Sequence, residues 1–367
     1  MDGQALTTFV ESVCGEGHLR VEADLGDGFV RLRSAEAERR QAAHDIRATE
    51  DIVIEMLRNA RDAQARNVFV AVTREGERRR VVMADDGCGI PAALQEKVFE
   101  PRVTSKLDTM HVDKWGVHGR GMALYSIAAN AESARVMASA PGLGTSIAVE
   151  TDLSRVGEKT DQSTFPTFEQ TAEGALSMRG PRNVLRTACE FALEHRASCN
   201  VYCGSATDVA ATLYAFGLAT LPAAQRAFCP RREDVPVCKR LATAADAATF
   251  AQVAETLGLS ISERSARRIM DGAILPLASL AERIGAEALA GRDAAGAGAS
   301  RQAKAPAAPT DARGLKLSAG DAAELKGAVR RAFADIARRY YLEEDTEPVL
   351  RVGKDAIHIT IPVAKLR

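Results

Sequence analysis

Residues 51–63 read Asp51-Ile-Val-Ile-Glu55-Met-Leu-Arg-Asn59-Ala-Arg-Asp62-Ala63, and this stretch decides the fold. Glu55, Asn59 and Asp62 are spaced i, i+4 and i+7, so on a helix they form one polar stripe. A second, apolar stripe consists of Val53, Met56, Leu57 and Ala60. The spacing therefore predicts an amphipathic helix that presents a carboxylate, an amide and a second carboxylate to one cavity.

Glycine-rich motifs follow this helix at the ends of predicted strands. Two runs rich in β-branched residues, 68–72 and 81–84, predict strands, and the second leads into Asp85-Asp86-Gly87-Cys88-Gly89-Ile90-Pro91. Glycines directly after a strand let the backbone approach a flat ligand closely. A carboxylate at the strand's end can accept a hydrogen bond from an exocyclic amine. Two more clusters, at 116–121 and 142–145, also lie at strand or helix junctions.

In this order, the motifs resemble those of the GHKL ATPase superfamily, which comprises gyrase B subunits, large heat-shock chaperones, histidine kinases and mismatch-repair MutL proteins. The resemblance covers residues 15–152. It implies an α+β fold of the Bergerat type, an α/β sandwich in which helices lie on one face of a mixed sheet. It also implies ATP and Mg²⁺ as cofactors.

The resemblance assigns roles to individual residues. Asn59 would coordinate a Mg²⁺ ion bound to the ATP phosphates, and Asp85 would accept a hydrogen bond from the adenine amine. Gly87 and Gly89 would line the base pocket, with Thr145 near the base. The other expected nucleotide contacts in or beside these motifs are Asp62, Ile90, Gly116 and Met122.

The phosphates would lie near the second glycine cluster. Gly119 and Gly121 would lead into a helix N-terminus, where exposed N–H groups and the helix dipole favour phosphate. Residues 100–118 would form a lid over the nucleotide. Lys106 and His118 in this lid, and Arg120 between the glycines, are interpreted either as phosphate contacts or as solvated residues.

Glu55 indicates the chemistry. In the hydrolysing branches of the superfamily, a glutamate four residues before the magnesium asparagine orients and deprotonates the attacking water, as a general base does. We therefore expect an ATP hydrolase in which Glu55 is the catalytic base and lid closure controls C-terminal domains or a protein partner. Anti-sigma-factor serine kinases also carry glutamate there, so phosphoryl transfer to a partner's histidine or serine is the alternative.

Composition restricts the class of protein. The chain has 367 residues, 46% hydrophobic and 26% charged, with a formal net charge of −1, so the global balance implies neither nucleic acid nor an anionic membrane. Seven cysteines and a start without a signal-peptide pattern predict a reducing, cytoplasmic location. The longest uncharged run, 209–225, falls short of the roughly 20 apolar residues that a spanning helix needs.

The rest of the chain divides by composition. An N-terminal hairpin across Asp27-Gly28 and a charged helix from Ala35 to about Ile46 belong to the ATP-binding domain, residues 1–152. We expect the following segments after it: a connector at 153–179, a mainly helical domain at 180–289, a flexible Ala/Gly/Pro linker at 290–314, and a small C-terminal α+β unit, a helix plus β-hairpin, at 315–367.

Residues 249–270 resemble a helix-turn-helix, and Arg264, Arg267 and Arg268 on its second helix would face DNA phosphates or base edges. This motif makes a DNA-associated ATPase a third hypothesis. The alternative is a plain pair of packed helices with a solvated basic face. A homodimer is also left open, because relatives that hydrolyse ATP often dimerise through the nucleotide domain.

Two other patterns favour ordinary structural roles. His44 resembles a phospho-acceptor, but only fifteen residues separate it from Asn59, too few for a separate dimerisation hairpin. The spacing of Cys189, His195, Cys199 and Cys203 matches no zinc-ligand pattern with paired Cys-x-x-Cys knuckles and is more typical of buried cysteines.

Overall fold

The computed structural model contains two compact units, Met1–Gly296 and Ala297–Arg367, and each is described by itself. It describes residues 21–34, 36–105, 111–113, 116–118, 121–159, 162, 164–170, 176–229, 231–286, 319–340, 342–352 and 357–364. Three predicted site residues, Lys106, Gly119 and Arg120, and the predicted linker at 290–314 lie outside these residues.

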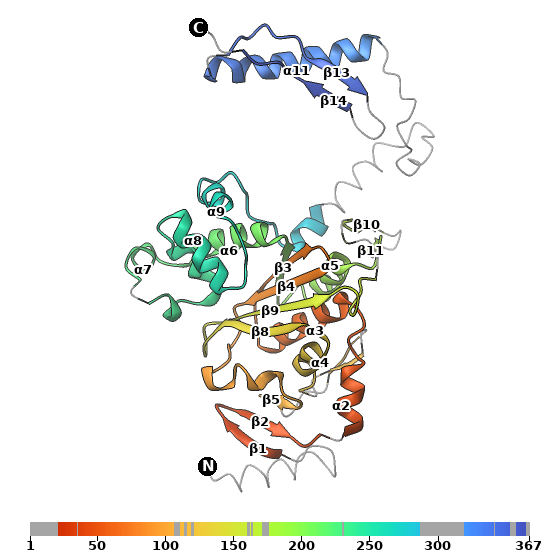
Figure 1. Ribbon diagram of the computed structural model, residues 1–367, viewed down its shortest axis with the longest axis vertical. Helices are drawn as coiled ribbons and strands as arrows, with labels where there is room; N and C mark the ends of the chain where they lie inside the picture. The colour runs from red at the N-terminus through yellow and green to blue at the C-terminus, as the bar shows by residue number, and fades with distance from the viewer. Residues whose placement is uncertain are drawn as a thin grey trace. The chain divides into compact units, whose positions relative to one another are not determined.

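A mixed five-stranded sheet with the strand order β12-β3-β4-β9-β8 forms the centre of the first unit (Figure 1). Its strands are β3 (Asn67–Glu75), β4 (Arg78–Asp85), β8 (Ser133–Ser139), β9 (Thr145–Asp152) and β12 (Asn200–Gly204). β12 runs parallel to β3, and the other neighbouring pairs are antiparallel. The predicted α+β class is therefore confirmed.

One face of the sheet packs against α3 (Thr49–Asp62), α4 (Ala123–Asn130) and α5 (Val184–Glu194). The helix predicted from the polar and apolar stripes is confirmed as α3, which buries Val53, Met56, Leu57 and Ala60. These side chains join Val68 and Val81 of the sheet and Phe191 of α5 in one apolar core. Asn183 caps α5, because its side chain accepts a hydrogen bond from the Arg186 N–H.

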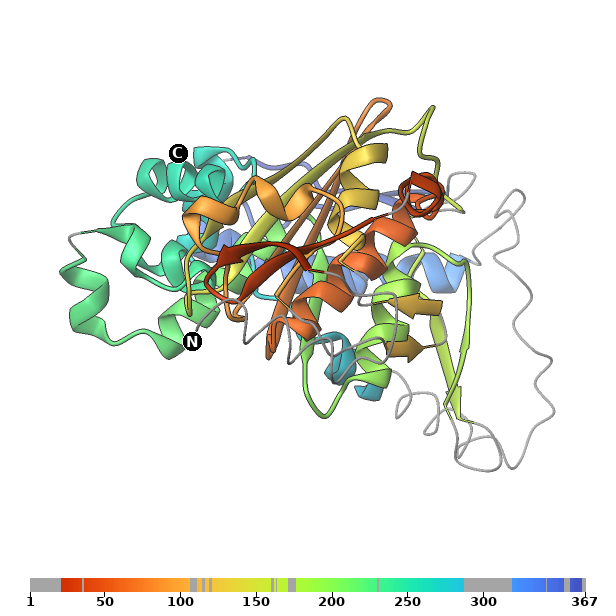
Figure 2. The same ribbon diagram turned by 90° about the horizontal axis from the view of Figure 1, so that it is seen from below.

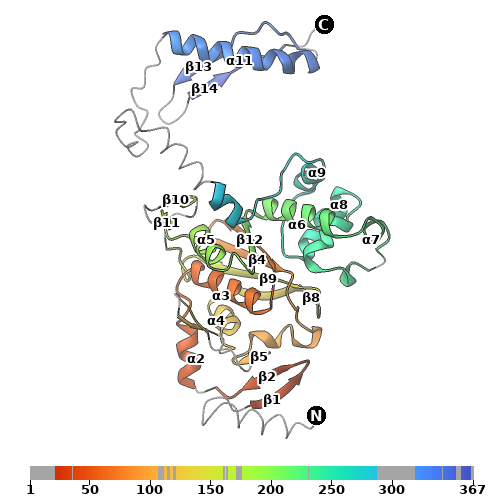
Figure 3. The same ribbon diagram turned by 180° about the vertical axis from the view of Figure 1, so that it is seen from behind.

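Helices also cover the opposite face, which the sequence did not predict. Phe69, Val82 and Ala84 pack there against α6 (Ala206–Thr220), the 3-10 helix η4 (Val237–Thr243), α8 (Ala247–Thr256) and α9 (Glu263–Met270). Figures 2 and 3 show the sheet between these helices and the α3, α4 and α5 group. The segment expected at 180–289 as a separate helical domain therefore supplies the edge strand β12 and the second cover of the same sheet.

Smaller elements complete the description of the first unit. The predicted N-terminal hairpin is confirmed as β1 (Val21–Gly26) and β2 (Phe29–Leu32), joined through Asp27 and Gly28 with φ of 52° and 79°. β2 also pairs with β5 (Val103–Thr104), which lies in the segment expected as a lid. Other elements described in this unit are α2 (Glu36–Ala43), η1 (Ala92–Leu94), η2 (Lys97–Phe99), β6 (His111–Asp113), β7 (Gly116–His118), β10 (Thr167–Gln170), β11 (Leu176–Arg179), α7 (Ala223–Ala227) and η3 (Arg232–Asp234).

The segment expected as a connector, 153–179, is more ordered than its composition suggested. It contains the antiparallel pair β10 and β11, and Phe168 of β10 is buried in the α3 and α5 core. Polar residues and glycines surround these short strands, which hid their pattern.

The second unit has the predicted helix and hairpin. α11 (Ala319–Tyr340) accompanies β13 (Val349–Val352) and β14 (Ile357–Thr360), which pair in antiparallel fashion. Phe333 and Ala337 of α11 are buried, whereas Ile357 and Ile359 of β14 are exposed.

Candidate functional site

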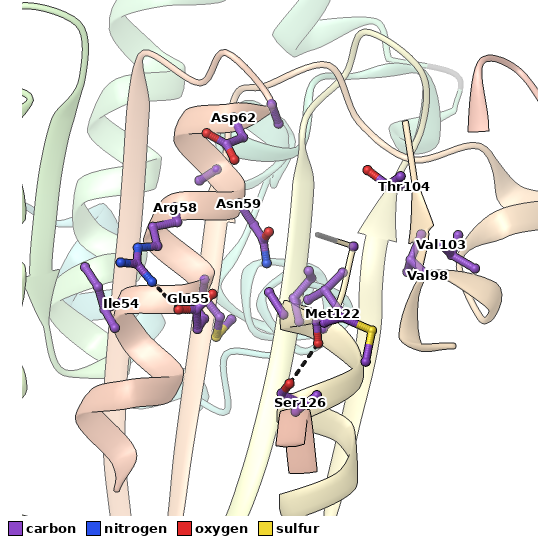
Figure 4. Close-up of a pocket in the computed structure, with 18 of the residues that line it drawn as sticks. Ile54, Glu55, Arg58, Asn59, Asp62, Val98, Val103, Thr104, Met122 and Ser126 are labelled. Carbon is purple, nitrogen blue, oxygen red and sulfur yellow. Dashed lines mark hydrogen bonds and ion pairs between the residues drawn. The ribbon is translucent and has the colours of Figure 1, made fainter. Parts of the chain in front are cut away.

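A cavity of about 910 Å³ lies between α3, the end of β4, the start of β9, the start of α4 and the short strand β5. It is the point where most of the predicted site residues meet, although they are distant in sequence. Its lining includes Glu55, Asn59, Asp62, Asp85, Gly89, Ile90, Gly121, Met122 and Thr145. Figure 4 shows the α3 side chains and Met122 around this cavity.

Helix α3 contributes the polar stripe. Glu55 and Asn59 lie one turn apart, and Glu55 accepts a hydrogen bond from Nη1 of Arg58, with which it forms an ion pair. In Figure 4 the side chain of Asn59 points from α3 toward Met122. Nδ2 of Asn59 is buried and has no hydrogen-bond partner among the described residues. A buried amide nitrogen of this kind requires an acceptor, which a bound ligand would supply.

Asp85, at the end of β4, is the buried carboxylate of the cavity. Its Oδ1 accepts a hydrogen bond from the Gly87 N–H at 2.9 Å. Burial raises the pKa of Asp85 to about 7, although hydrogen bonds from the Gly87 and Thr145 backbones oppose the shift and the neighbouring Asp86 charge adds to it. The β4–β9 register places Thr145 directly opposite Asp85, which explains how residues 60 positions apart share one pocket wall.

The adjacent carboxylate, Asp86, has a structural role. Its Oδ1 accepts hydrogen bonds from the backbone N–H groups of Arg66 and Asn67, each at 2.8 Å, and its Oδ2 accepts from the Asn67 side chain at 2.8 Å. These bonds tie the start of β3 to the end of β4. The Asp85-Asp86 pair thus divides into one carboxylate that faces the cavity and one that holds the sheet.

Glycines allow two loops to meet at this wall. A Cβ atom on Gly89 would lie 1.9 Å from the Ala140 carbonyl oxygen, and one on Gly144 would lie 2.2 Å from the Asp85 carbonyl oxygen. Both glycines have positive φ, 74° and 82°. Gly87, expected to line the base pocket, is not among the described lining residues and instead orients Asp85 through its N–H.

Sequence reasoning missed Ser139, at the end of β8. Its Oγ accepts from the Ile90 N–H at 2.7 Å and lies 3.0 Å from Oγ1 of Thr145. Ser139 therefore connects the two glycine loops. Only its position one residue before the second loop could have indicated this, because a single serine carries no motif.

The opposite end of the cavity is formed by the segment around β5 and by the start of α4. Gly121 has a φ of 67°, and a Cβ atom there would lie 3.2 Å from the Arg102 backbone. Arg102, which was also missed, is buried, forms an ion pair with Glu38 and lines the cavity. Ser126 of α4 donates a hydrogen bond to the Met122 carbonyl at 2.9 Å. Gly116 and His118 belong to β7. The structure does not describe what surrounds them.

The helix-turn-helix-like segment packs on the sheet. Ser146 of β9 donates to the Leu257 carbonyl at 2.8 Å, and Arg80 of β4 donates to the Gly258 carbonyl at 3.1 Å. Ala266 and Ile269 of α9 are buried. The three arginines singled out from the sequence, Arg264, Arg267 and Arg268, are exposed. The pair is thus a sheet cover whose outer face is basic.

The cysteines near His195 lie in the core. Cys189, Cys199 and Cys203 are buried, and burial raises the pKa of both Cys199 and Cys203 to about 12. Within the described part of the chain, no cluster of three or more His, Cys, Asp or Glu side chains could hold a metal ion by itself. None of the helices described there has the length and apolar character needed to cross a membrane.

Comparison with known proteins identifies this region. Residues 44–155 match the family described as histidine kinase-, DNA gyrase B-, and HSP90-like ATPase. This segment belongs to the GHKL ATPase superfamily. We call the domain that contains residues 44–155 the GHKL domain. The Bergerat-type fold expected from the sequence is therefore confirmed for it, and further helices cover the second face of its sheet.

Among curated proteins, part of this chain is similar to DNA mismatch repair proteins MutL. That of Aquifex pyrophilus is 36% identical over 104 residues, which are 27% of this chain and 24% of the relative. That of Anaplasma phagocytophilum is 38% identical over 74 residues, 19% of this chain and 12% of the relative. This chain thus covers a quarter or less of the length of these relatives.

Proposed function

We propose that the GHKL domain binds Mg-ATP in the cavity beside α3 and hydrolyses it. The observation that carries the proposal is that Glu55 and Asn59 of α3 line the same cavity as Asp85 and Thr145 of the sheet. A carboxylate and an amide on one helix thereby share a cavity with a buried carboxylate on a strand. Mg-ATP needs both ends of such a site: polar groups for the metal and the phosphates, and an acceptor for the adenine amine.

The adenine would lie at the sheet end of the cavity. The carboxylate of Asp85, held by the Gly87 N–H, would accept a hydrogen bond from the exocyclic amine. Gly89 and Gly144 let the two loops that form this wall approach each other closely, because a Cβ atom on either would clash with a neighbouring backbone carbonyl. Thr145 and Ile90 would complete the base pocket.

The phosphates would lie between α3 and the start of α4. The buried amide of Asn59 fits this arrangement, because its oxygen can ligate Mg²⁺ while its nitrogen, which has no partner among the described residues, donates to a phosphate oxygen. Asp62, one turn later, adds a carboxylate to the same wall. When bound, Mg²⁺ neutralises charge on the phosphates. The N–H groups that follow Gly121 at the start of α4 would hold phosphate oxygens.

Glu55 would act as the general base. Its carboxylate takes a proton from water while the water oxygen attacks the γ-phosphorus, and the bond to the β,γ-bridging oxygen breaks to leave ADP and inorganic phosphate. We propose that residues 100–118 form a lid, and that its closure over the nucleotide couples this reaction to the rest of the chain or to a protein partner.

The test uses ATP labelled at the γ-phosphate, with the wild-type protein and Glu55→Gln. We expect the wild type to release labelled inorganic phosphate, and Glu55→Gln to retain nucleotide affinity while losing about a hundredfold or more of the turnover. Equal turnover in the two proteins would show that Glu55 is not the base. Label trapped on a protein histidine or serine would favour the protein kinase alternative.

A DNA-associated ATPase is the second candidate, since the matched relatives are DNA mismatch repair proteins and α9 exposes three arginines. Arg264, Arg267 and Arg268 would contact phosphates through a salt-dependent interaction. Fluorescence anisotropy with duplex DNA tests this role: a triple Arg→Gln variant should weaken binding and reduce its salt dependence. Unchanged binding would leave α9 as a sheet cover with a solvated face.

A further inference from the structure

A buried arginine, Arg58, lies between Glu55 and Asn59 in the sequence of α3. Arg58 follows Glu55 by three positions and directly precedes Asn59, and it lines the same cavity. Its side chain is 4% exposed and that of Glu55 is 20% exposed, so the arginine lies deeper than the carboxylate. In the view of Figure 4, the Arg58 guanidinium lies on one side of Glu55 and the Asn59 amide on the other.

The contact between the two side chains restrains the carboxylate. Nη1 of Arg58 donates to Oε1 of Glu55 across one helical turn. A guanidinium is planar, stays charged and presents its donors in a rigid fork, so it restricts rotation of the carboxylate that it binds. Because burying an arginine is costly without a partner, the side chain is held in this pairing rather than in water.

We propose that Arg58 is a positioning residue, which holds the Glu55 carboxylate in the orientation that accepts the proton of the attacking water. The inference rests on the proposed hydrolysis and adds a residue to it. Arg58 binds one carboxylate oxygen of Glu55 on the side away from Asn59. The same bond fixes the direction in which the second carboxylate oxygen points. A base that is misdirected by about 1 Å loses on the order of a hundredfold in rate.

Two other roles would behave differently in a kinetic experiment. If the pair only stabilised α3, its loss would lower the free energy of unfolding but leave the turnover of the folded protein unchanged. If Arg58 withheld Glu55 from the water, its removal would raise turnover. Turnover at saturating ATP, measured beside nucleotide affinity, therefore separates the three roles.

The experiment compares Arg58→Met, Arg58→Lys, Glu55→Gln and the double variant Glu55→Gln/Arg58→Met in the full chain. We expect Arg58→Met to lower kcat by about tenfold to a hundredfold with the Kd for Mg-ATP within about threefold of wild type. Arg58→Lys should restore part of the loss. The double variant should be no slower than Glu55→Gln alone, because without the base there is nothing to position.

The matched control is Arg79→Met, which removes another buried arginine that pairs with a glutamate, Glu158, outside the cavity. This variant should lower stability but leave kcat unchanged. Should Arg58→Met fail to fold, Arg58→Lys alone decides: a lowered kcat with unchanged Kd supports positioning, and wild-type kcat overturns it.

The outcomes distinguish this inference from the proposed function. No phosphate release by the wild type overturns both. Release by the wild type that is lost in Glu55→Gln, together with unchanged or raised kcat in Arg58→Met, overturns the role of Arg58 alone. Additive effects of the two substitutions would likewise overturn it.

Discussion

Asp85 shows how burial of one side chain creates a dependence on pH. Its pKa is raised from 3.8 to about 7, so between these values the folded state binds more protons than the unfolded state, and this contribution to stability falls as pH rises. The ionised carboxylate is the better acceptor for an adenine amine. We predict that Mg-ATP affinity rises between about pH 6 and about pH 8, as Asp85 ionises.

Isothermal titration calorimetry would measure this rise against Asp85→Asn as the reference, because the ATP phosphates titrate in the same range. The variant should bind about tenfold more weakly at the upper end, where the wild type gains a charge-assisted hydrogen bond. Parallel pH profiles for the two proteins would contradict the assignment.

Gly144 and Gly142 provide a matched pair of substitutions in one loop. Both have positive φ, 82° and 73°, so alanine costs about 1 kcal/mol at either position. Of the two, it is at Gly144 that the added Cβ meets another backbone, 2.2 Å from the Asp85 carbonyl oxygen, whereas no atom of the described residues lies within 4 Å at Gly142. Gly144→Ala should therefore lower both the stability and the nucleotide affinity more than Gly142→Ala. Urea unfolding and calorimetry would check this, and equal losses would disprove the close approach.

At the scale of elements, α8 and α9 resemble a helix-turn-helix motif but pack against one face of the sheet. Phe250 of α8 is 0% exposed in the second core, whereas Phe228, after α7, is 84% exposed. We predict that Phe250→Ala lowers the free energy of unfolding by about 3–5 kcal/mol. Phe228→Ala should change it by no more than about 0.5 kcal/mol. Equal effects in urea titrations would show that α8 is not part of the core.

At the scale of the molecule, the GHKL domain depends on residues far downstream of its motifs. The strand β12 and the helices α5, α6, α8 and α9 complete the sheet and both of its cores. We predict that residues 1–296 fold and bind Mg-ATP, because the first unit is contained in them. Residues 1–179 should aggregate or unfold, since they leave Phe69 and Val82 without cover. Circular dichroism and calorimetry on the two fragments would test this, and a folded, nucleotide-binding 1–179 would refute it.

The amino-acid sequence by itself determined the local features: the two stripes of α3, the hairpin at Asp27-Gly28, the strands before the glycine loops, and part of the set of residues that line the cavity. These follow from periodicity and from backbone freedom at glycine, which act over a few residues. They also carry the resemblance that assigns Glu55 and Asn59 their expected roles.

Only the tertiary structure decided which distant segments join. An apolar strand such as Asn200–Gly204 does not specify its partner, so its place beside β3, and the cover that α6, η4, α8 and α9 give the second face, could not be inferred from pattern. The division of work between Asp85 and Asp86, and the burial of the Arg58–Glu55 pair, were hidden for the same reason. Each depends on burial and on hydrogen-bond partners that exist only once the chain has folded.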